Sequence, residues 1–394
     1  MKERMYVDFH VLQTVPPSCV NRDDMGQPKT ATYGGTTRAR VSSQSWKYAI
    51  RERFMEIFPK EQVGIRTRRL IDLIAGYIRE ENPEIDEKEA AKRAQTVLEA
   101  VGFKFKSKNE EENPDDDEKK TDKKSRKKTE NDKTPNANAV FFISKAQAMA
   151  IAKIAAFHSG TTYSKEEKQE CVKALQENPS IDIALFGRML AGNSDLKTDA
   201  SVQVAHAIST HAVNNEYDDF TAVDDYTKDD NTGAGHMGTA AYNSCTMYRF
   251  ASLNVTDLNR ILQGTDTAEV VREFAEAFIC SMPAGKQNSF ASATLPDVVY
   301  ITIRKDRPVN LCGAFEKAIK PSENGNAEPS ANALKQYAKN LYEDYDAPEK
   351  AMTVGRGMEE IAEKMSFHEL LDALEEEVSN ATAGKDGGLT KEAV

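Results

Sequence analysis

The stretch RARVSSQSWKYAIR, residues 38–51, contains a change of sequence period that decides the local fold. From Arg38 to Val41, polar and apolar side chains alternate, which is typical of a strand. After Ser42, apolar residues recur at spacings of three to four, at Trp46, Ile50, Phe54 and Ile57. This spacing predicts an amphipathic helix that Ser42 or Ser43 can cap. The chain therefore passes from strand to helix within a few residues.

The same stretch carries a candidate anion-binding surface. A helix start presents backbone N–H groups and, here, serine hydroxyls to an anion. Lys47 and Arg51 extend positive charge along the helix one turn apart, and Arg38 and Arg40 add charge from the strand. Such a distributed array suits a phosphodiester backbone better than one small phosphate. A solvated basic helix face is an equally compatible interpretation of this pattern.

Upstream and downstream, the periods of the sequence alternate between strand and helix. Residues 5–12 alternate like a half-buried strand that ends at Pro16-Pro17. Further strands are expected at 139–143, 181–186, 200–208, 247–255 and 298–303, and a protruding hairpin at 214–238. Helices are expected at 67–81, 87–101, 144–158, from Ser164 onward, and at 268–281, 312–319, 331–345 and 358–378. This order predicts an α+β domain with long insertions.

The charge of the chain is unevenly distributed. The 394 residues carry a net charge of -11, yet residues 1–60 hold 10 bases against 6 acids, and residues 341–394 hold 14 acids against 5 bases. The acidic average therefore does not exclude a local phosphate-binding surface. Between residues 104 and 133, 11 bases and 10 acids surround a single apolar residue, Phe105, which predicts a disordered surface loop.

Five widely spaced cysteines without a C-x-x-C pair favour a reducing compartment over a disulfide framework or a cysteine-based zinc site. No stretch approaches the length of a membrane span, and no signal core follows the N-terminus, so we expect a cytoplasmic protein without membrane contact.

Other motifs are weaker indications of chemistry. Residues 233–238 fit G-x-G-x-x-G, but the preceding residues are polar where a dinucleotide site requires a buried strand. His206 and His211 are five residues apart, which favours structural histidines over metal ligands. The carboxylate pairs Asp23-Asp24 and Asp224-Asp225 more often cap backbone amides in loops than bind a cation. No cofactor and no metal are expected.

Several collinear motifs resemble the CasC family, the CRISPR RNA backbone subunits of type I-E Cascade complexes. The resemblance spans residues 5–317 and rests on residues 17–24, Gly34-Gly35, 38–47, 181–189, 205–211, 220–225 and 283–287. The acidic C-terminal region is only loosely similar, and the charged insertion departs from the family pattern.

The resemblance implies an RRM-like (ferredoxin-like) palm, a helical fingers insertion and a β-hairpin thumb. The expected bounds are 1–60 for the first palm part, 61–180 for the fingers with a disordered loop at 104–138, 181–211 for palm strands, 212–245 for the thumb, 246–320 for the remaining palm, and 321–394 for an acidic helical region. Implied partners are CRISPR RNA, the target DNA strand, further copies of the chain, and the CasA, CasB, CasD and CasE families.

The resemblance also implies which residues contact RNA. Backbone contacts are expected from Ser43, Gln44, Lys47 and Arg51, with Arg22, Arg38, Arg40 and Lys286 as further candidates. Met189, Phe220 and Thr221 are expected to surround a displaced nucleotide, because apolar stacking does not depend on base identity. Arg188 is a further RNA-binding candidate. Asp219 stands where some relatives carry an aromatic residue. Core packing is the alternative role for Met189 and Phe220.

Two other functions remain open. A metal-dependent ribonuclease would use Asp23, Asp24 or His10, and a self-assembling structural protein would bind no nucleic acid. The expected function is a non-enzymatic scaffold that polymerises along the spacer of the CRISPR RNA, displaces bases periodically with its thumb, and presents the guide for Watson-Crick pairing in antiviral defence.

Overall fold

The computed structural model describes residues 4–105, 135, 137, 139–158, 160–190, 193–222, 236–263 and 265–383. The chain divides into two compact units, each considered by itself. We call them the sheet unit, Met1–Ile57 with Ser201–Arg260 and Gly264–Val394, and the helical unit, Phe58–Ala200 with Ile261–Gln263. The charged loop expected at 104–138 lies mostly outside the described residues.

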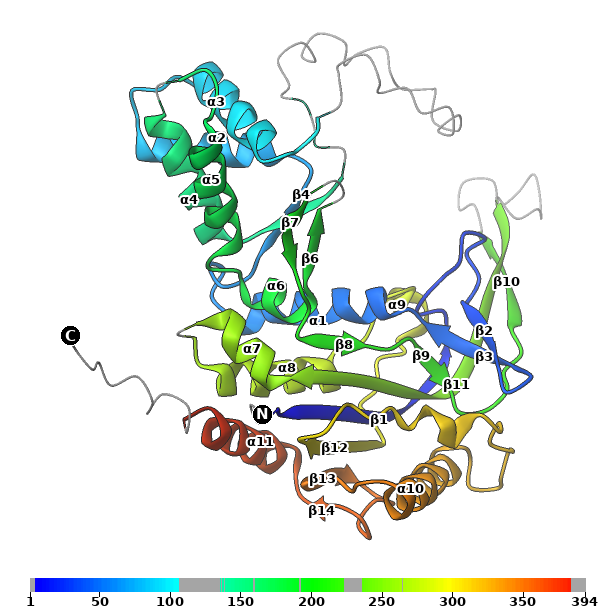
Figure 1. Ribbon diagram of the computed structural model, residues 1–394. Coiled ribbons are helices and arrows are strands. Elements are labelled where there is room, and N and C mark those ends of the chain that lie inside the picture. Colours follow the sequence, from blue (N-terminus) through cyan, green and yellow to red (C-terminus); the bar gives the residue numbers. More distant parts are fainter. Residues whose placement is uncertain are drawn as a thin grey trace, which may run out of the picture. The chain divides into compact units, whose positions relative to one another are not determined.

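The sheet unit is built on a ten-stranded, largely antiparallel sheet with the order β14-β13-β12-β1-β11-β9-β3-β2, from which β8 and β10 branch by pairing with β11 (Figure 1). The central strands are β1 (Tyr6–Ser18), β11 (His236–Asn254) and β12 (Val298–Arg304). The others are β2 (Thr30–Tyr33), β3 (Thr36–Val41), β8 (Val202–Val204), β9 (Ala207–Ser209), β10 (Glu216–Ala222), β13 (Lys350–Gly355) and β14 (Glu363–Lys364). This large sheet with helices confirms the α+β class.

Strand β1 is buried on both faces. Phe9 lies 5.4 Å from Phe274 and 5.8 Å from Phe278, ring centre to ring centre, both on helix α8 (Thr267–Cys280). On the opposite face, His10 Nδ1 lies 2.8 Å from the Tyr248 hydroxyl. The half-buried pattern expected for residues 5–12 is therefore wrong, because the polar residues of the alternation lie in a second, hydrogen-bonded core beneath further helices.

The prolines at 16 and 17 do not end β1. The strand continues to Ser18, and the pairing register with β11 shifts between Val15 and Ser18. An irregularity in the ladder accommodates residues that cannot donate a backbone hydrogen bond, which is why prolines are tolerated here.

Seven helices complete the described part of the sheet unit or begin in it: α1 (Ser43–Ile57), α7 (Val255–Leu262), α8, α9 (Gln287–Phe290), the 3-10 helix η2 (Leu311–Phe315), α10 (Ala327–Asp344) and α11 (Phe367–Ala383). Two helix predictions need correction. The helix expected at 312–319 is the shorter η2, and the one expected at 358–378 begins only at Phe367, because β14 occupies residues 363–364.

The helical unit contains α2 (Leu70–Glu81), α3 (Glu87–Ala100), α4 (Lys145–Phe157), α5 (Lys165–Gln176) and α6 (Ile181–Phe186). Two short antiparallel pairs join them, β4 (Ile65–Thr67) with β5 (Phe141–Ile143) and β6 (Arg188–Leu190) with β7 (Asn193–Thr198). Ser164 and Glu167 form the expected capping box at the start of α5. None of the described helices has the length and apolarity needed to cross a membrane.

The strand expected at 181–186 is instead helix α6. The apolar run Ile181–Phe186 is buried almost throughout, and periodicity alone does not distinguish a short buried strand from a short buried helix. The Asp182 carboxylate accepts hydrogen bonds from Gly64 N at 2.8 Å and from Ser180 Oγ at 2.7 Å, which fixes the start of the helix. Because α6, β6 and β7 belong to the helical unit, the sheet unit resumes at Ser201 and not at residue 181.

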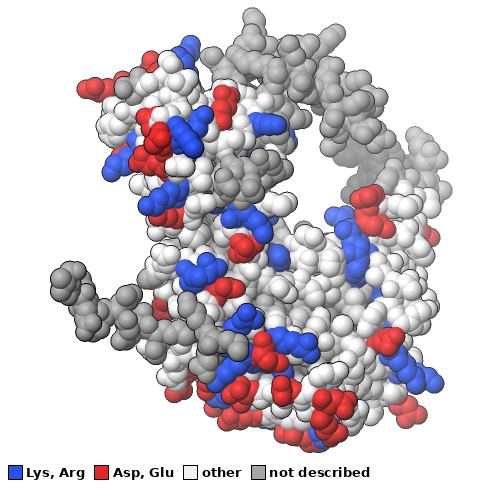
Figure 2. Space-filling view, in the orientation of Figure 1, with Lys and Arg blue, Asp and Glu red and all other residues white. Residues whose placement is uncertain are grey.

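The acidic C-terminal region forms ion pairs within the sheet unit. Glu360 contacts both Lys335 and Lys339, and Lys350 lies 2.9 Å from Glu377. Figure 2 shows acidic and basic side chains intermixed over the lower part of the view, where α10, α11 and β13 lie. Acids counted at 341–394 are thus paired with bases of the same region or of α10.

Candidate nucleic-acid interface

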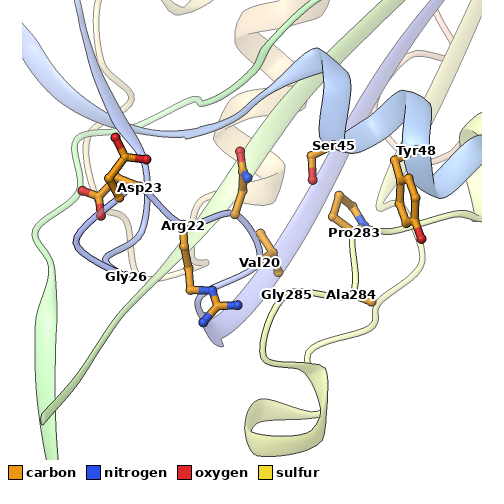
Figure 3. A pocket seen from close by; sticks show the side chains of 11 residues that line it. Val20, Arg22, Asp23, Gly26, Ser45, Tyr48, Pro283, Ala284 and Gly285 are labelled. Atoms are coloured by element: carbon orange, nitrogen blue, oxygen red, sulfur yellow. The ribbon is translucent and has the colours of Figure 1, made fainter. Parts of the chain in front are cut away.

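A cleft of about 640 Å³ lies at the start of helix α1. Three segments line it: residues 20–26 after β1, Ser45 and Tyr48 of α1, and Pro283–Gly285 after α8. Figure 3 shows Arg22 on one side of the cleft and Tyr48 on the other, with Val20 and Pro283 between them. Segments that are far apart in the sequence therefore meet at one site within the sheet unit.

The start of α1 is fixed to the first of these segments. Ser42 N donates to Asn21 Oδ1 at 2.9 Å, and Ser42 O accepts from Ser45 N and Trp46 N at 3.0 and 3.2 Å. Trp46, Ile50 and Phe54 are buried, which confirms the predicted helix and its apolar face. The first N–H groups of a helix have no intrahelical acceptor, so this end of α1 can bind anions.

The third segment approaches the residues that follow β1 very closely. A Cβ atom on Gly285 would lie 2.3 Å from Val20 O, so only glycine allows this contact. Lys286 and Ala291 bracket α9 in the left-handed region, with φ of 50° and 45°. Such backbone angles are strained for residues other than glycine, and they persist only where the surrounding structure imposes them. The segment is thus held in one conformation beside the cleft.

Arg22 lines this cleft, and a second cation, Lys286, directly follows the lining residue Gly285. The positive charges of Lys286 and Arg22 act on the buried Cys19 thiol, opposing the rise of its pKa that burial causes. Arg22 is exposed, and neither cation forms an ion pair within the part of the chain that the structure describes. Both side chains are therefore available to a phosphate-bearing ligand.

The neighbouring carboxylate has a structural role. Asp23 Oδ1 accepts from Met25 N at 3.0 Å and from Gln27 N at 2.9 Å, so it closes the loop that follows Arg22. This is the backbone-capping role that the sequence favoured for Asp23. Among the described residues, no group of three or more histidine, cysteine, aspartate or glutamate side chains could hold a metal ion.

A family model described as "CT1975-like protein" matches residues 7–378. The chain belongs to this family. Two solved chains, each titled as part of a "CRISPR RNA-guided surveillance complex", the first "pre-nicking", are similar to this CT1975-like protein in structure. The first is 32% identical with a TM-score of 0.78 and covers 95% of this chain and 100% of its own length. The second is 26% identical with a TM-score of 0.68 and covers 94% and 99%. No curated protein sequence matches the chain.

The side chains that were predicted to contact RNA around this cleft differ in exposure. Gln44 is exposed and Ser43 half-buried at the helix start. Lys47 is half-buried, and burial lowers its pKa. Arg51 is only 7% exposed, so it contributes less to the surface than its position one turn beyond Lys47 predicted. Arg40 donates from Nε to Thr30 O at 3.2 Å, and its Nη1 lies 3.1 Å from His206 Nδ1.

Arg38 has a structural role in place of the expected RNA contact. Its guanidinium is fully buried and donates to Thr36 Oγ1 and to the carbonyl oxygens of Ser209, Thr210, Phe315 and Glu316. These bonds join β3, β9 and η2. A guanidinium whose donors are all engaged inside the protein does not reach a phosphate, so the prediction for Arg38 is corrected.

The predicted RNA contact of Arg188 is also corrected, because this guanidinium is buried and bonded inside the protein as well. It lies in the helical unit, is 5% exposed, and donates to the carbonyl oxygens of Leu196, Phe142 and Leu175 and to Gln147 Oε1. Burial lowers its pKa to about 10. An alternation of polar and apolar residues does not show which arginines are internal, so neither case could be predicted from it.

The residues expected to surround a displaced nucleotide are exposed. Met189 is 78% exposed and Phe220 is 47% exposed, so neither packs in a core. Phe220 and Thr221 lie on β10, which pairs with β11 in the expected hairpin, and the residues between the two strands lie outside the described residues, as do Asp224 and Asp225. The Phe220 ring covers Gly238, where a Cβ atom would lie 2.6 Å from it.

Sequence analysis missed Ser45 and Tyr48. Tyr48 is 60% exposed and faces the cleft one helical turn after Gln44 (Figure 3). The signal was present, because a large aromatic residue on the polar side of an amphipathic helix has no core to pack against. An exposed tyrosine in a cleft that Arg22 also lines can stack on a base or donate to a phosphate.

His10 and His211 have structural roles. His10 is 1% exposed, and burial lowers its pKa to about 3, so it stays neutral inside the protein. His211 Nε2 accepts from Thr246 N at 3.1 Å while Nδ1 lies 2.9 Å from Ala212 O. This confirms the structural role that the spacing of His206 and His211 favoured for His211.

Proposed function

We propose that this CT1975-like protein is the CRISPR RNA-binding backbone subunit, CasC, of a type I-E Cascade surveillance complex. The observation that carries the proposal is the cleft in which the Arg22 loop, the start of α1 and the Pro283–Gly285 segment before Lys286 meet. The family match and the similarity to chains of CRISPR RNA-guided surveillance complexes support it. In this proposal, the sheet unit is an RRM-like palm and the helical unit the fingers.

The geometry suits recognition of an RNA backbone. Helix N–H groups, hydroxyls and two cations bind phosphates without reading sequence. Tyr48 adds an aromatic surface at the same site. Specificity then comes from Watson-Crick pairing between the guide and the target DNA strand, as in other RNA-guided effectors.

The β10–β11 hairpin would act as the thumb. It projects Phe220, Thr221 and Met237, all exposed, from the sheet unit. Apolar side chains of this kind can separate neighbouring bases whatever their identity. We propose that copies of the chain polymerise along the spacer RNA, each thumb displacing a nucleotide at a regular interval next to Met189 of a neighbour.

The subunit itself would not cut nucleic acid. The alternative, a metal-dependent ribonuclease, would need an accessible acid or base among His10, Asp23 and Asp24. His10 is enclosed in the core and Asp23 is bound to backbone amides, which leaves Asp24. Incubation of the assembled complex with complementary RNA and magnesium tests this directly: loss of an observed cleavage in Asp24→Asn would favour the ribonuclease.

Equilibrium binding of the purified protein to two single-stranded RNAs of unrelated sequence tests the proposal. We expect closely similar affinities for the two RNAs and a steep decrease of both with salt. A protein that binds neither RNA would contradict the proposal and favour a structural protein that assembles without nucleic acid.

A further inference from the structure

A buried arginine lies directly beneath helix α1. Arg249 of β11 is 1% exposed, and its guanidinium carbon lies 3.8 Å from the centre of the Trp46 ring and 4.7 Å from that of Phe278. Trp46 is on α1, two residues before the cleft-lining Tyr48, and Phe278 is on α8. Arg249 therefore packs between the helix at the cleft and the helix that leads into the Pro283–Gly285 segment.

Hydrogen bonds lead from Arg249 through Gln13 to Thr294, which follows the Pro283–Gly285 segment in the chain. Its Nη1 donates to Gln13 Oε1 at 2.6 Å, and its Nη2 donates to Phe278 O. Gln13 Nε2 donates in turn to Thr294 O at 2.7 Å, and Thr294 Oγ1 donates to Thr14 O at 2.8 Å. The path runs from α1 through β11 and β1 to residue 294.

The segment that this path reaches carries Lys286. We call residues 283–294 the Lys286 segment. One part of it packs on Val20 through Gly285, another places Phe290 5.9 Å from Tyr242 of β11, ring centre to ring centre, and its end is bonded to Gln13 and Thr14. With these contacts fixed, the position of Lys286 beside the cleft is determined by β1 and by the residues that hold Gln13.

Burial of the Arg249 guanidinium without a carboxylate partner lowers the free energy of unfolding through desolvation. No carboxylate pairs with Arg249 among the described residues, and burial lowers its pKa to about 9. A buried charge held only by neutral acceptors and aromatic faces stabilises a fold less than an apolar side chain of similar volume would. Its directional bonds do, however, impose one relative position on α1, β1 and the Lys286 segment.

We propose that Arg249 is a positioning residue for RNA binding: through Gln13 and Thr294 it sets the location of Lys286 relative to the start of α1. This inference rests on the proposed RNA-binding function. Arg249 touches no RNA itself. Loss of Arg249 shifts Lys286 away from the phosphate that it contacts near the start of α1. The effects of changing Arg249 and Lys286 on RNA affinity are therefore coupled.

A double-mutant cycle with Arg249→Met and Lys286→Ala tests the coupling. We expect Lys286→Ala to weaken RNA binding about fivefold at 0.1 M salt, which is the contribution of one phosphate contact to the affinity for a single strand. In the Arg249→Met background we expect the same change to cost less than about twofold, since Lys286 no longer meets its phosphate. Thermal melting reports whether each variant is folded.

Arg272→Met is the matched control background. Arg272 lies on α8 and pairs with Glu273, Asp372 and Glu375, so its loss removes a partly buried arginine whose ion pairs are to α8 and α11 and not to the Lys286 segment. Lys286→Ala should keep its full effect there. If Arg249→Met does not fold, Gln13→Met breaks the same path while leaving Arg249 on Trp46.

The outcomes separate the inference from the proposed function. An equal loss from Lys286→Ala in all backgrounds would overturn the positioning role of Arg249 and leave RNA binding at the cleft intact. No loss from Lys286→Ala in the otherwise unchanged protein would overturn both. A loss that shrinks with Arg249→Met or Gln13→Met and persists with Arg272→Met supports the inference.

Discussion

Replacement of the two cations at the cleft should change the salt dependence of RNA binding by a calculable amount. Arg22 and Lys286 come from different loops and have no ion-pair partner among the described residues. If each contacts one phosphate, Arg22→Ala with Lys286→Ala removes two contacts. Each contact to a single strand contributes about 0.7 to the slope of log K against log salt, so the slope should fall by about 1.4.

The same relation gives the expected loss of affinity. At 0.1 M salt, two contacts correspond to a factor of about 25, or about 1.9 kcal/mol per copy. The measurement is fluorescence anisotropy with labelled single-stranded RNA between about 50 and 200 mM salt. Two RNAs of unrelated sequence should show the same loss, because phosphate contacts carry no sequence information.

A charge-matched control distinguishes local contacts from the overall field of the protein. Arg356→Ala with Lys364→Ala removes two positive charges near β13 and β14, at the opposite end of the sheet order from β3. The control should leave the slope unchanged. An unchanged slope in Arg22→Ala with Lys286→Ala, or an equal change in the control, would refute the assignment of phosphate contacts to the cleft.

Three further changes test other parts of the structure. Arg38→Lys should lower the free energy of unfolding by about 3 kcal/mol in denaturant titrations, because lysine cannot reach all five acceptors. The salt slope of RNA binding, measured by fluorescence anisotropy, should stay the same in the folded variant. Phe220→Ala should leave the melting temperature nearly unchanged but weaken binding of every RNA, by about 1 to 3 kcal/mol if the ring stacks on a base; a loss for one sequence alone would argue against this. Burial raises the pKa of Asp8 to about 6 from 3.8, so the folded state holds the proton more tightly than the unfolded state, and stability from this group is present below about pH 4 and lost as the pH rises through 6. Compared with Asp8→Asn, the unchanged protein should therefore lose about 3 kcal/mol of unfolding free energy between pH 4 and 7 in denaturant titrations; parallel pH profiles would contradict this.

The sequence predicted those elements whose signals are local. The α1 helix follows from the spacing of Trp46, Ile50 and Phe54, and the start of α5 from its capping box. Both depend on contacts within a few residues. The α+β class also followed from the order of the periods, because long insertions between strands leave the sheet to be assembled from distant segments.

The errors arise where burial depends on distant partners. Residues 181–186 form a helix whose start is bonded to Gly64 through Asp182, a contact that no local pattern encodes. Arg38 and Arg188 read as surface charges, yet both are surrounded by carbonyl oxygens from remote segments. Long-range contacts of this kind decide whether a charged residue lies inside or outside.

The candidate site shows the same division. The sequence identified the segments around Arg22, α1 and Lys286 separately, and the structure brings them to one cleft. Tyr48 was missed because it lies on the polar side of α1, where only hydroxyl, amide and charged side chains were taken as candidate contacts. The link from Arg249 to Thr294 could not be predicted from the sequence, since it joins β11, β1 and the Lys286 segment through side chains that have no local pattern.

Analysis of the nucleic acid that co-purifies with the protein tests the central claim most directly. The account predicts an absorbance excess near 260 nm that ribonuclease removes and deoxyribonuclease does not. Sequencing should then show RNAs that share one repeat-derived sequence and differ in the spacer. Protein that carries no nucleic acid, or RNA fragments without a shared repeat, would contradict the assignment of this chain as a CRISPR RNA backbone subunit.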